Sequence, residues 1–130
     1  MLFSECENSK QQGNIALGQA IAYFTSKRYV VLLPLNDAQE YDLVVDINGI
    51  LNKVQVKSTK CKAPSGAFQV SVKSSGGSKR EVYHHVCESD CDYLFVTTDN
   101  CTNYLIPREI FINNKSSINL TDQLKEFIVF

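Results

Sequence analysis

The chain has 130 residues, of which 44% are hydrophobic and 21% charged, the composition of one globular domain, so we expect residues 1–130 to share a single core. Its 13 Lys and Arg nearly balance 14 Asp and Glu, so the net charge of −1 excludes a uniformly basic protein, and a nucleic-acid-binding surface has to be local. The longest apolar runs, such as Tyr29–Leu33 and Phe127–Phe130, are far shorter than the roughly 20 residues of a bilayer span, and we expect no membrane partner.

A helix and a buried strand are the first elements that the sequence predicts. Apolar residues recur at three- and four-residue steps between Gly13 and Lys27, a stripe typical of an amphipathic helix. Tyr29–Leu33 then forms a short continuous apolar run that ends at Pro34, a residue that cannot continue a hydrogen-bonded ladder. This pattern indicates a strand buried on both faces.

The next segment predicts a β-hairpin. Tyr41–Ile47 and Leu51–Thr59 are strand-like runs, and Asn48-Gly49 between them is a dipeptide that accepts a positive φ at both centres of a tight turn. Phe68–Lys73 alternates apolar and polar residues, which is the period of a strand with one wet face. We expect this strand to extend the same sheet.

The last third of the chain predicts further helices and strands. Glu81–Glu88 reads as a short helix, Asp92–Thr98 and Tyr104–Ile106 as a strand pair, and Pro107 as the first turn of a brief helix. Leu120–Phe130 reads as a final helix, whose apolar end would pack on the core or form a subunit interface. The resulting order, α-β-β-β-β-α-β-β-α, belongs to the α/β (α+β) class.

The cysteines and the N-terminus indicate a reducing compartment. The five cysteines are odd in number and irregularly spaced, and Met1–Glu7 carries no basic segment followed by an apolar stretch. We therefore expect reduced thiols in a cytoplasmic or nucleoid-associated protein that is not secreted. His84, His85, Cys87 and Cys91 offer soft ligands for zinc, but they lack a second well-spaced pair, which favours a helix end with buried cysteines.

Three polar residues of the predicted hairpin form the sharpest candidate site. Asp42 opens the first strand, while Gln55 and Lys57 lie two apart on the second and therefore share a face. Pairing across the turn would bring Asp42 within reach of both. The carboxylate of Asp42, the amide oxygen of Gln55 and the backbone carbonyl of Val56 suit Mg²⁺. Lys57 beside such an ion would orient or deprotonate a water, or neutralise charge that grows on phosphorus.

A basic segment surrounds this site. From Lys53 to Arg80 the chain contains no Asp or Glu, although acids outnumber bases elsewhere. A one-signed surface with glycine-containing loops is what a segment that contacts a phosphate backbone uses, and we expect Ser74–Arg80 to enter a DNA groove. Besides Lys57, the candidate DNA-binding residues are Lys53, Lys60, Lys62, Lys73, Lys79 and Arg80.

Five segments carry a resemblance to a known family: Gly13-Asn14-Ile15, Lys27–Pro34, Tyr41–Asp46, Gln55–Thr59 and Tyr104–Pro107. Their order and spacing resemble the PD-(D/E)XK nuclease superfamily. More narrowly, they are similar to its group I intron-encoded homing endonucleases, whose motif has Gln where most relatives have Asp or Glu. The similarity spans the chain from Gly13 to about Pro107.

The resemblance implies a restriction-endonuclease-like fold, in which helices flank a mixed central sheet, and Mg²⁺-dependent hydrolysis of DNA phosphodiesters. It makes Asp42 a metal ligand, places Gln55 in the second ligand position and makes Lys57 the catalytic lysine. A homing-type enzyme cuts both strands of a specific site in double-stranded DNA. Because two cuts need two active sites, the resemblance also implies a homodimer or homotetramer.

The first helix departs from the family pattern. Many relatives place a Glu or Asp there as a further metal ligand, whereas the stretch expected to face the site holds Asn14, Leu17, Gly18 and Gln19. Either an amide at Asn14 or Gln19 substitutes, or Glu5 or Glu7 reaches in, or metal binding is weaker. One carboxylate favours a one-metal mechanism. Two alternatives stay open: a Holliday-junction resolvase-like nuclease, because resolvases share the hairpin site, and a catalytically inactive DNA-binding protein with the nuclease fold.

Overall fold

The chain folds into one long helix, two short helical segments and nine strands within the residues that the computed structural model describes, namely 1–36, 40–76, 82–85, 91–113 and 116–130. In chain order these are α1 (Ser9–Ser26), β1 (Val30–Leu32), β2 (Leu43–Ile47), β3 (Ile50–Thr59), β4 (Phe68–Ser71), β5 (Lys73–Gly76), β6 (Val82–His85), β7 (Tyr93–Thr98), β8 (Asn103–Pro107), α2 (Arg108–Phe111), β9 (Ser117–Leu120) and the 3₁₀ helix η2 (Asp122–Phe127). No helix among these residues is long and apolar enough to cross a bilayer.

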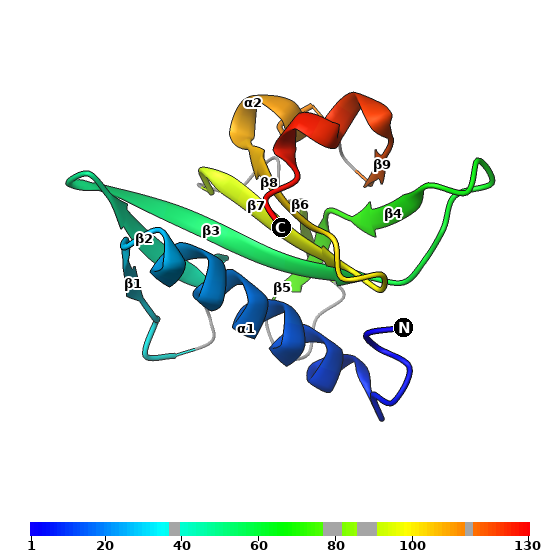
Figure 1. The fold of residues 1–130 in the computed structure, drawn as a ribbon, viewed down its shortest axis with the longest axis horizontal. Coiled ribbons are helices and arrows are strands. Elements are labelled where there is room, and N and C mark those ends of the chain that lie inside the picture. Colours follow the sequence, from blue (N-terminus) through cyan, green and yellow to red (C-terminus); the bar gives the residue numbers. More distant parts are fainter. Residues whose placement is uncertain (37–39, 77–81, 86–90, 114–115) are drawn as a thin grey trace.

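The central sheet is mixed. It has five strands in the order β1-β2-β3-β7-β8, in which β3 and β7 are parallel and the other neighbours antiparallel. Two smaller sheets stand apart from it, one formed by β4 and β9 and the other by β5 and β6. Figure 1 shows α1 along one side of the central sheet, with α2 and the helical segment that follows β9 on the other. This arrangement confirms the predicted mixed central sheet flanked by helices.

The predicted hairpin is confirmed with its turn. Asn48 and Gly49 have φ values of 54° and 89°, the two positive values that a type I′ turn requires. The Gly49 N–H also donates a 2.8 Å hydrogen bond to Asp46 Oδ1. The turn sets a register in which Leu43 faces Val54, and both of these side chains are fully buried.

Helix α1 begins earlier than predicted because Asn8 caps it. The Asn8 side chain accepts a 2.9 Å hydrogen bond from the Gln11 N–H, so the helix starts at Ser9 and runs through Gly13. Its buried residues, Ala16, Ala20 and Phe24, lie on the predicted stripe. Ala20 and Phe24 pack on the sheet against Leu43, Val45, Val54 and Phe95.

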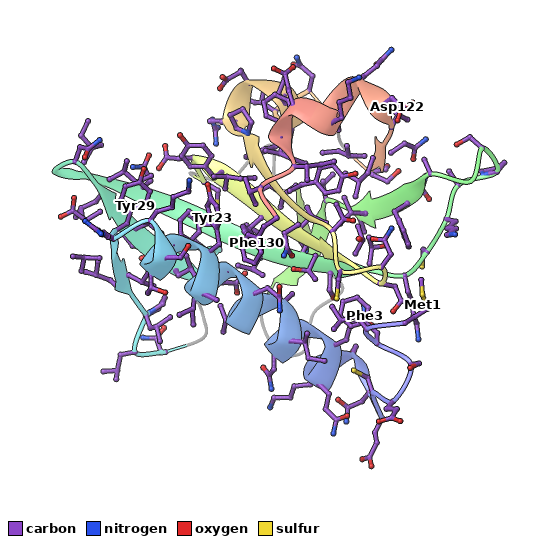
Figure 2. All side chains as sticks on the ribbon, viewed as in Figure 1. Met1, Phe3, Tyr23, Tyr29, Asp122 and Phe130 are labelled. Atoms are coloured by element: carbon purple, nitrogen blue, oxygen red, sulfur yellow. The ribbon has the colours of Figure 1, made fainter. Side chains whose placement is uncertain are left out.

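The C-terminal residues pack on their own chain. The Val129 N–H donates a 2.9 Å hydrogen bond to the Asn103 carbonyl, and Ile128 forms a bridge with Tyr104 on the outer edge of β8. Phe130 stacks on Tyr23 of α1 at 5.5 Å between ring centroids, and Figure 2 shows the two rings beside each other. The structure therefore shows this apolar end packed on its own chain, with Ile128 and Phe130 43% and 52% exposed, and a role in a subunit interface stays a prediction.

The strand after α1 differs from its prediction. Tyr29–Leu33 was expected to be buried on both faces, yet β1 is the edge strand of the central sheet, and Val30 and Leu32 are 62% and 42% exposed. Only the face that carries Val31 packs against the core beneath α1. An apolar run of five residues is equally compatible with a central and an edge strand, because strand order depends on long-range pairing.

Three further predictions were wrong. Within Glu81–Glu88, residues Val82–His85 form β6 rather than a helix, and the rest of that range lies outside the described residues. Phe68–Lys73 does not extend the central sheet, because β4 ends at Ser71 and pairs with β9. Leu120–Phe130 is not one α-helix: Leu120 closes β9, and a 3₁₀ helix follows. β4 and β9 pair with each other although they are distant along the chain, whereas β6 pairs with the preceding strand β5. In these segments strand pairing overrides the local pattern.

Candidate active site

Asp42 and Gln55 meet at the base of the hairpin. Asp42 directly precedes β2, one register step beyond the Leu43–Val54 pair, so it lies opposite Gln55. Its backbone N–H donates a 2.8 Å hydrogen bond to the Val54 carbonyl. Its carboxylate oxygen Oδ2 accepts a 2.9 Å bond from Gln55 Nε2 and a 2.7 Å bond from the Val56 N–H. The carboxylate is therefore fixed against β3, as the sequence predicted.

Lys57 joins this pair on the same side of the sheet. Gln55 and Lys57 face Leu94 and Val96 on the neighbouring parallel strand β7, and these two residues belong to the core cluster away from α1. Lys57 is half-buried and lies close enough to Asp42 for the two charges to interact. The spatial premise of the sequence analysis, a carboxylate, an amide and an ammonium at one place, is present in the fold.

Burial shifts both charged groups toward their neutral forms. Desolvation raises the pKa of Asp42, and the Val56 N–H and the Lys57 charge lower it in part. Desolvation lowers the pKa of Lys57, and the neighbouring Asp42 charge opposes this shift. An acid with a raised pKa beside a lysine with a lowered pKa is typical of a site that moves protons or binds a charged ligand.

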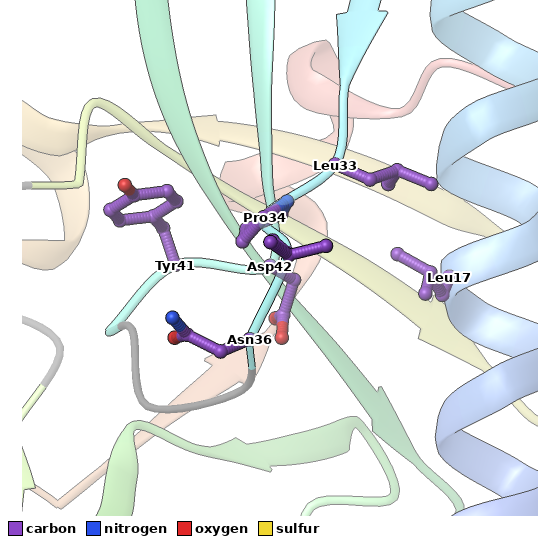
Figure 3. A pocket seen from close by; sticks show the side chains of 7 residues that line it. Leu17, Leu33, Pro34, Asn36, Tyr41 and Asp42 are labelled. Carbon is purple, nitrogen blue, oxygen red and sulfur yellow. The ribbon is translucent and has the colours of Figure 1, made fainter.

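An open pocket of about 540 Å³ leads to Asp42. Figure 3 shows Leu17 extending from α1 toward the segment that carries Asp42. The remaining lining residues come from the segment after β1 and from the residue before Asp42: Leu33, Pro34, Leu35, Asn36 and Tyr41. Among these lining residues Asp42 is the one carboxylate, and α1 contributes an apolar side chain.

The other helix candidates lie elsewhere. Asn14 and Glu5 line a separate pocket near the N-terminus, together with Cys6 and other residues. The Gln19 side chain accepts a 3.0 Å hydrogen bond from Asn103 Nδ2, so its amide is engaged at β8. Asn14 and Gln19 therefore supply no substitute for the family's helix carboxylate, and Leu17 is the α1 residue that lines the pocket with Asp42.

The predicted DNA-binding residues fall into three groups. Lys53 places its Nζ 5.4 Å from the ring centroid of Tyr41, beside the candidate site. Lys60 and Lys62 are exposed in the segment after β3. Lys73 begins β5, a strand described by its backbone, and Lys79 and Arg80 lie outside the described residues, as does most of the expected groove-entering loop.

Cys91, considered above as a zinc ligand or a buried cysteine, is a neighbour of the site that its sequence pattern did not predict. Cys91 is fully buried, donates a 3.5 Å hydrogen bond to the Glu40 carbonyl, and interacts electrostatically with Lys57. Arg108 Nη1 donates a 2.8 Å bond to the Cys91 carbonyl. Burial suits a packing role for this thiol. The zinc alternative rests on Cys87, which lies outside the described residues, and on two histidines described by their backbone.

The donor set fits one hard divalent cation. The described residues contain no cluster of three His, Cys, Asp or Glu side chains. A strand residue directs its N–H and C=O to the same side, and the Val56 N–H points to Asp42, so the Val56 carbonyl lies on that side too. A half-turn of the Gln55 amide would present its oxygen next to the Asp42 carboxylate. One carboxylate with two neutral oxygens suits Mg²⁺ completed by water.

Comparison with known proteins places this geometry in a family. A family model described as PD-(D/E)XK endonuclease matches residues 7–127. The solved structure of a bacterial homing endonuclease, I-Ssp6803I, is similar with a TM-score of 0.75 and 32% sequence identity, over 88% of this chain and 79% of that one. No curated protein matches significantly. The fold is restriction-endonuclease-like, and the chain belongs to the PD-(D/E)XK endonuclease family.

Proposed function

We propose that this protein is a Mg²⁺-dependent endonuclease that cuts both strands of double-stranded DNA at specific sites. The observation that carries the proposal is the convergence of Asp42, Gln55 and Lys57 at the base of one hairpin. Membership of the endonuclease family supports the reaction class, and the similar homing endonuclease supports site-specific cleavage.

Each residue has a defined role in this proposal. Asp42, Gln55 and the Val56 carbonyl would hold the ion, which when bound supplies positive charge at the scissile phosphate. Lys57 faces the same point, and its lowered pKa lets it accept the proton of the attacking water. After that transfer the ammonium stabilises the negative charge that develops on the phosphoryl oxygens. Asp42 also keeps Lys57 oriented toward the reacting group.

The proposed partner is duplex DNA bound by more than one subunit. Each subunit has one hairpin site of this kind, so cleavage of both strands requires a homodimer or homotetramer. The lysines around the site supply charge for the phosphate backbone: Lys53 lies beside Asp42, and Lys60 and Lys62 are exposed beyond β3. The proposed location is the cytoplasm or the nucleoid, where the substrate is found.

The test is cleavage of supercoiled plasmid DNA in Mg²⁺, with the cut ends mapped by sequencing. Asp42→Asn and Lys57→Met should each lower the cleavage rate by at least about 100-fold. Gln123→Ala removes an exposed amide on η2 and serves as the matched control, expected to cut as the parent does. If both active-site variants cut as fast as the parent, the assignment fails.

Leu17 supports a second candidate, a DNA-binding protein with the nuclease fold and no cleavage activity. An apolar residue at the pocket leaves Asp42 as the one carboxylate among the described lining residues, which would weaken metal binding. This candidate predicts DNA binding that falls steeply between about 50 and 200 mM salt and is unaffected by Mg²⁺ or by Lys57→Met. Cleavage of four-way junctions in preference to linear duplex would instead indicate a resolvase-like enzyme.

A further inference from the structure

The two-stranded sheet of β4 and β9 has one apolar face and one polar face. Val70 and Ile118 point inward and belong to the core cluster that covers the central sheet. The residues on either side of each along its strand point the other way and are amides and hydroxyls. In register these outward pairs are Gln69 with Asn119 and Ser71 with Ser117.

We propose that this outward face reads base edges in the major groove of the DNA substrate, with Gln69 and Asn119 as the main specificity-determining residues. The inference rests on the proposed function, because it assigns the substrate-recognition surface of the same enzyme. The major groove admits a two-stranded β-ribbon, and Asn and Gln side chains pair with the donor and acceptor groups of adenine.

The two amides are fixed relative to each other. Gln69 Nε2 donates a 2.8 Å hydrogen bond to Asn119 Oδ1 across the two strands. This bond uses one donor of Gln69 and one acceptor position of Asn119, so the pair keeps both donor and acceptor capacity for a ligand. Asn119 is exposed and Gln69 is half-buried. A neutral pair of this kind matches a base edge, which presents donors and acceptors together, better than it matches a phosphate.

The residues around Gln69 and Asn119 suit a negatively charged polymer that also carries hydrogen-bonding groups. Gln69, Ser71 and Ser117 line an open pocket of about 410 Å³ together with Lys60 and further polar residues. Among the described residues, its lining contains no carboxylate and no aliphatic or aromatic side chain. Lys62 is exposed on the same loop as Lys60. A positively charged margin around a neutral polar face is the charge distribution that DNA recognition requires, with lysines on phosphates and amides on bases.

The ribbon is rigidly attached to the strand that carries Lys57. Thr59, two residues after Lys57 on β3, donates through Oγ1 to the Gln69 carbonyl. The Cys61 N–H donates a 3.1 Å bond to Thr59 Oγ1, and the Gln69 N–H donates a 2.9 Å bond to the Cys61 carbonyl. Bases held on this face would therefore stand at a fixed distance from the catalytic centre, as site-specific cleavage requires.

The test is a binding selection from a duplex library with a randomised central region, performed in EDTA so that no DNA is cut. Gln69→Ala and Asn119→Ala should each lower the preference for the favoured base at one or two positions by about tenfold, with the rest of the profile unchanged. Lys60→Ala should weaken binding to all sequences alike and reduce the salt dependence. Gln123→Ala, an exposed amide on η2, is the matched control and should keep the parent profile.

The outcomes separate this proposal from the proposed function. Three outcomes would each overturn the base-reading role. The base profile is unchanged in both amide variants, or these variants lose affinity for all sequences alike, or the parent enriches no sequence. Both amide variants lose the bond between Gln69 and Asn119, so circular dichroism and thermal unfolding are used to check that they fold. Ser71→Ala tests the same face without breaking that bond. Plasmid cleavage in Mg²⁺ tests the nuclease independently, since it needs no sequence preference.

Discussion

The carboxylate of Asp42 accepts a 2.9 Å hydrogen bond from the amide of Gln55, a residue 13 positions away in the chain. The hairpin register produces this contact, since the two residues continue the Leu43–Val54 pairing by one step. The Val56 N–H binds the same oxygen at 2.7 Å. A partly buried acid is thus held by two donors at the position where the proposed cation binds.

Burial of Asp42 makes the folding stability depend on pH. Because its pKa is raised in the folded state, the native protein binds this proton more tightly than the unfolded chain does. Stability therefore falls as pH rises from the ordinary aspartate pKa, about 3.9, through the raised value. Asp42→Asn removes the effect. The free energy of unfolding of the variant should therefore increase relative to that of the parent as pH rises, by about 1.4 kcal/mol for each pKa unit by which Asp42 is shifted.

Urea unfolding in EDTA at pH 4 and pH 7 measures this difference. A variant whose free energy of unfolding differs from the parent's by the same amount at both pH values would show that the Asp42 pKa is not raised. The same variant should cut no plasmid, which would separate the stability of the site from its activity.

Gln55→Glu should make the fold dependent on a divalent cation. The substitution removes the 2.9 Å bond and sets two carboxylates against each other, which costs roughly 1–2 kcal/mol at pH 7 without metal. Added Ca²⁺ should then raise the melting temperature of the variant more than that of the parent. Gln55→Met is the control, since it loses the bond without adding charge. Equal Ca²⁺ responses in all three proteins would contradict a cation site here.

Leu17→Glu should strengthen metal binding. The side chain at position 17 lines the pocket with Asp42, so a glutamate there adds a second carboxylate to a site that has one among its lining residues. Ligand charge is a main determinant of divalent-cation affinity, and we expect about tenfold tighter binding by calorimetry. Leu17→Gln has similar size without the charge. If both variants bind Mg²⁺ equally, α1 does not face the cation.

Lys57→Arg should lose both the rate and the pH dependence of cleavage. The lowered pKa of Lys57 allows a neutral amine to form below the ordinary lysine value of about 10.4, so the parent's single-turnover rate should rise with pH and then level off. A guanidinium stays protonated throughout this range and cannot accept the proton. An arginine variant with the parent's rate and profile would show that position 57 supplies positive charge alone.

The candidate site could be predicted from sequence because its determinants are local. Asn48-Gly49 fixes the turn, the turn fixes the register, and the two-residue period of a strand puts Gln55 and Lys57 on one face. The apolar spacing of α1 likewise predicts the face that packs on the sheet.

The remaining features depend on contacts between distant segments. Among the described residues, the outer edge of β1 has no neighbouring strand in the central sheet, and β4 pairs with β9 rather than with that sheet, although both segments read as ordinary strands. The rotation of α1 on the sheet determines which of Leu17, Asn14 and Gln19 lies near Asp42. The apolar stripe alone does not fix this rotation closely enough to distinguish these positions, and in the structure it is Leu17 that lines the pocket with Asp42. Cys91 reaches Lys57 through the packing of β7 beside β3.

The most direct test of the central claim is a crystal of the protein grown or soaked with Mn²⁺. We predict an anomalous peak in contact with the Asp42 carboxylate and the Val56 carbonyl, with the Gln55 amide turned so that its oxygen faces the ion. Well-ordered Asp42, Gln55 and Lys57 side chains with no peak between them at saturating Mn²⁺, or a peak at other residues alone, would contradict the account.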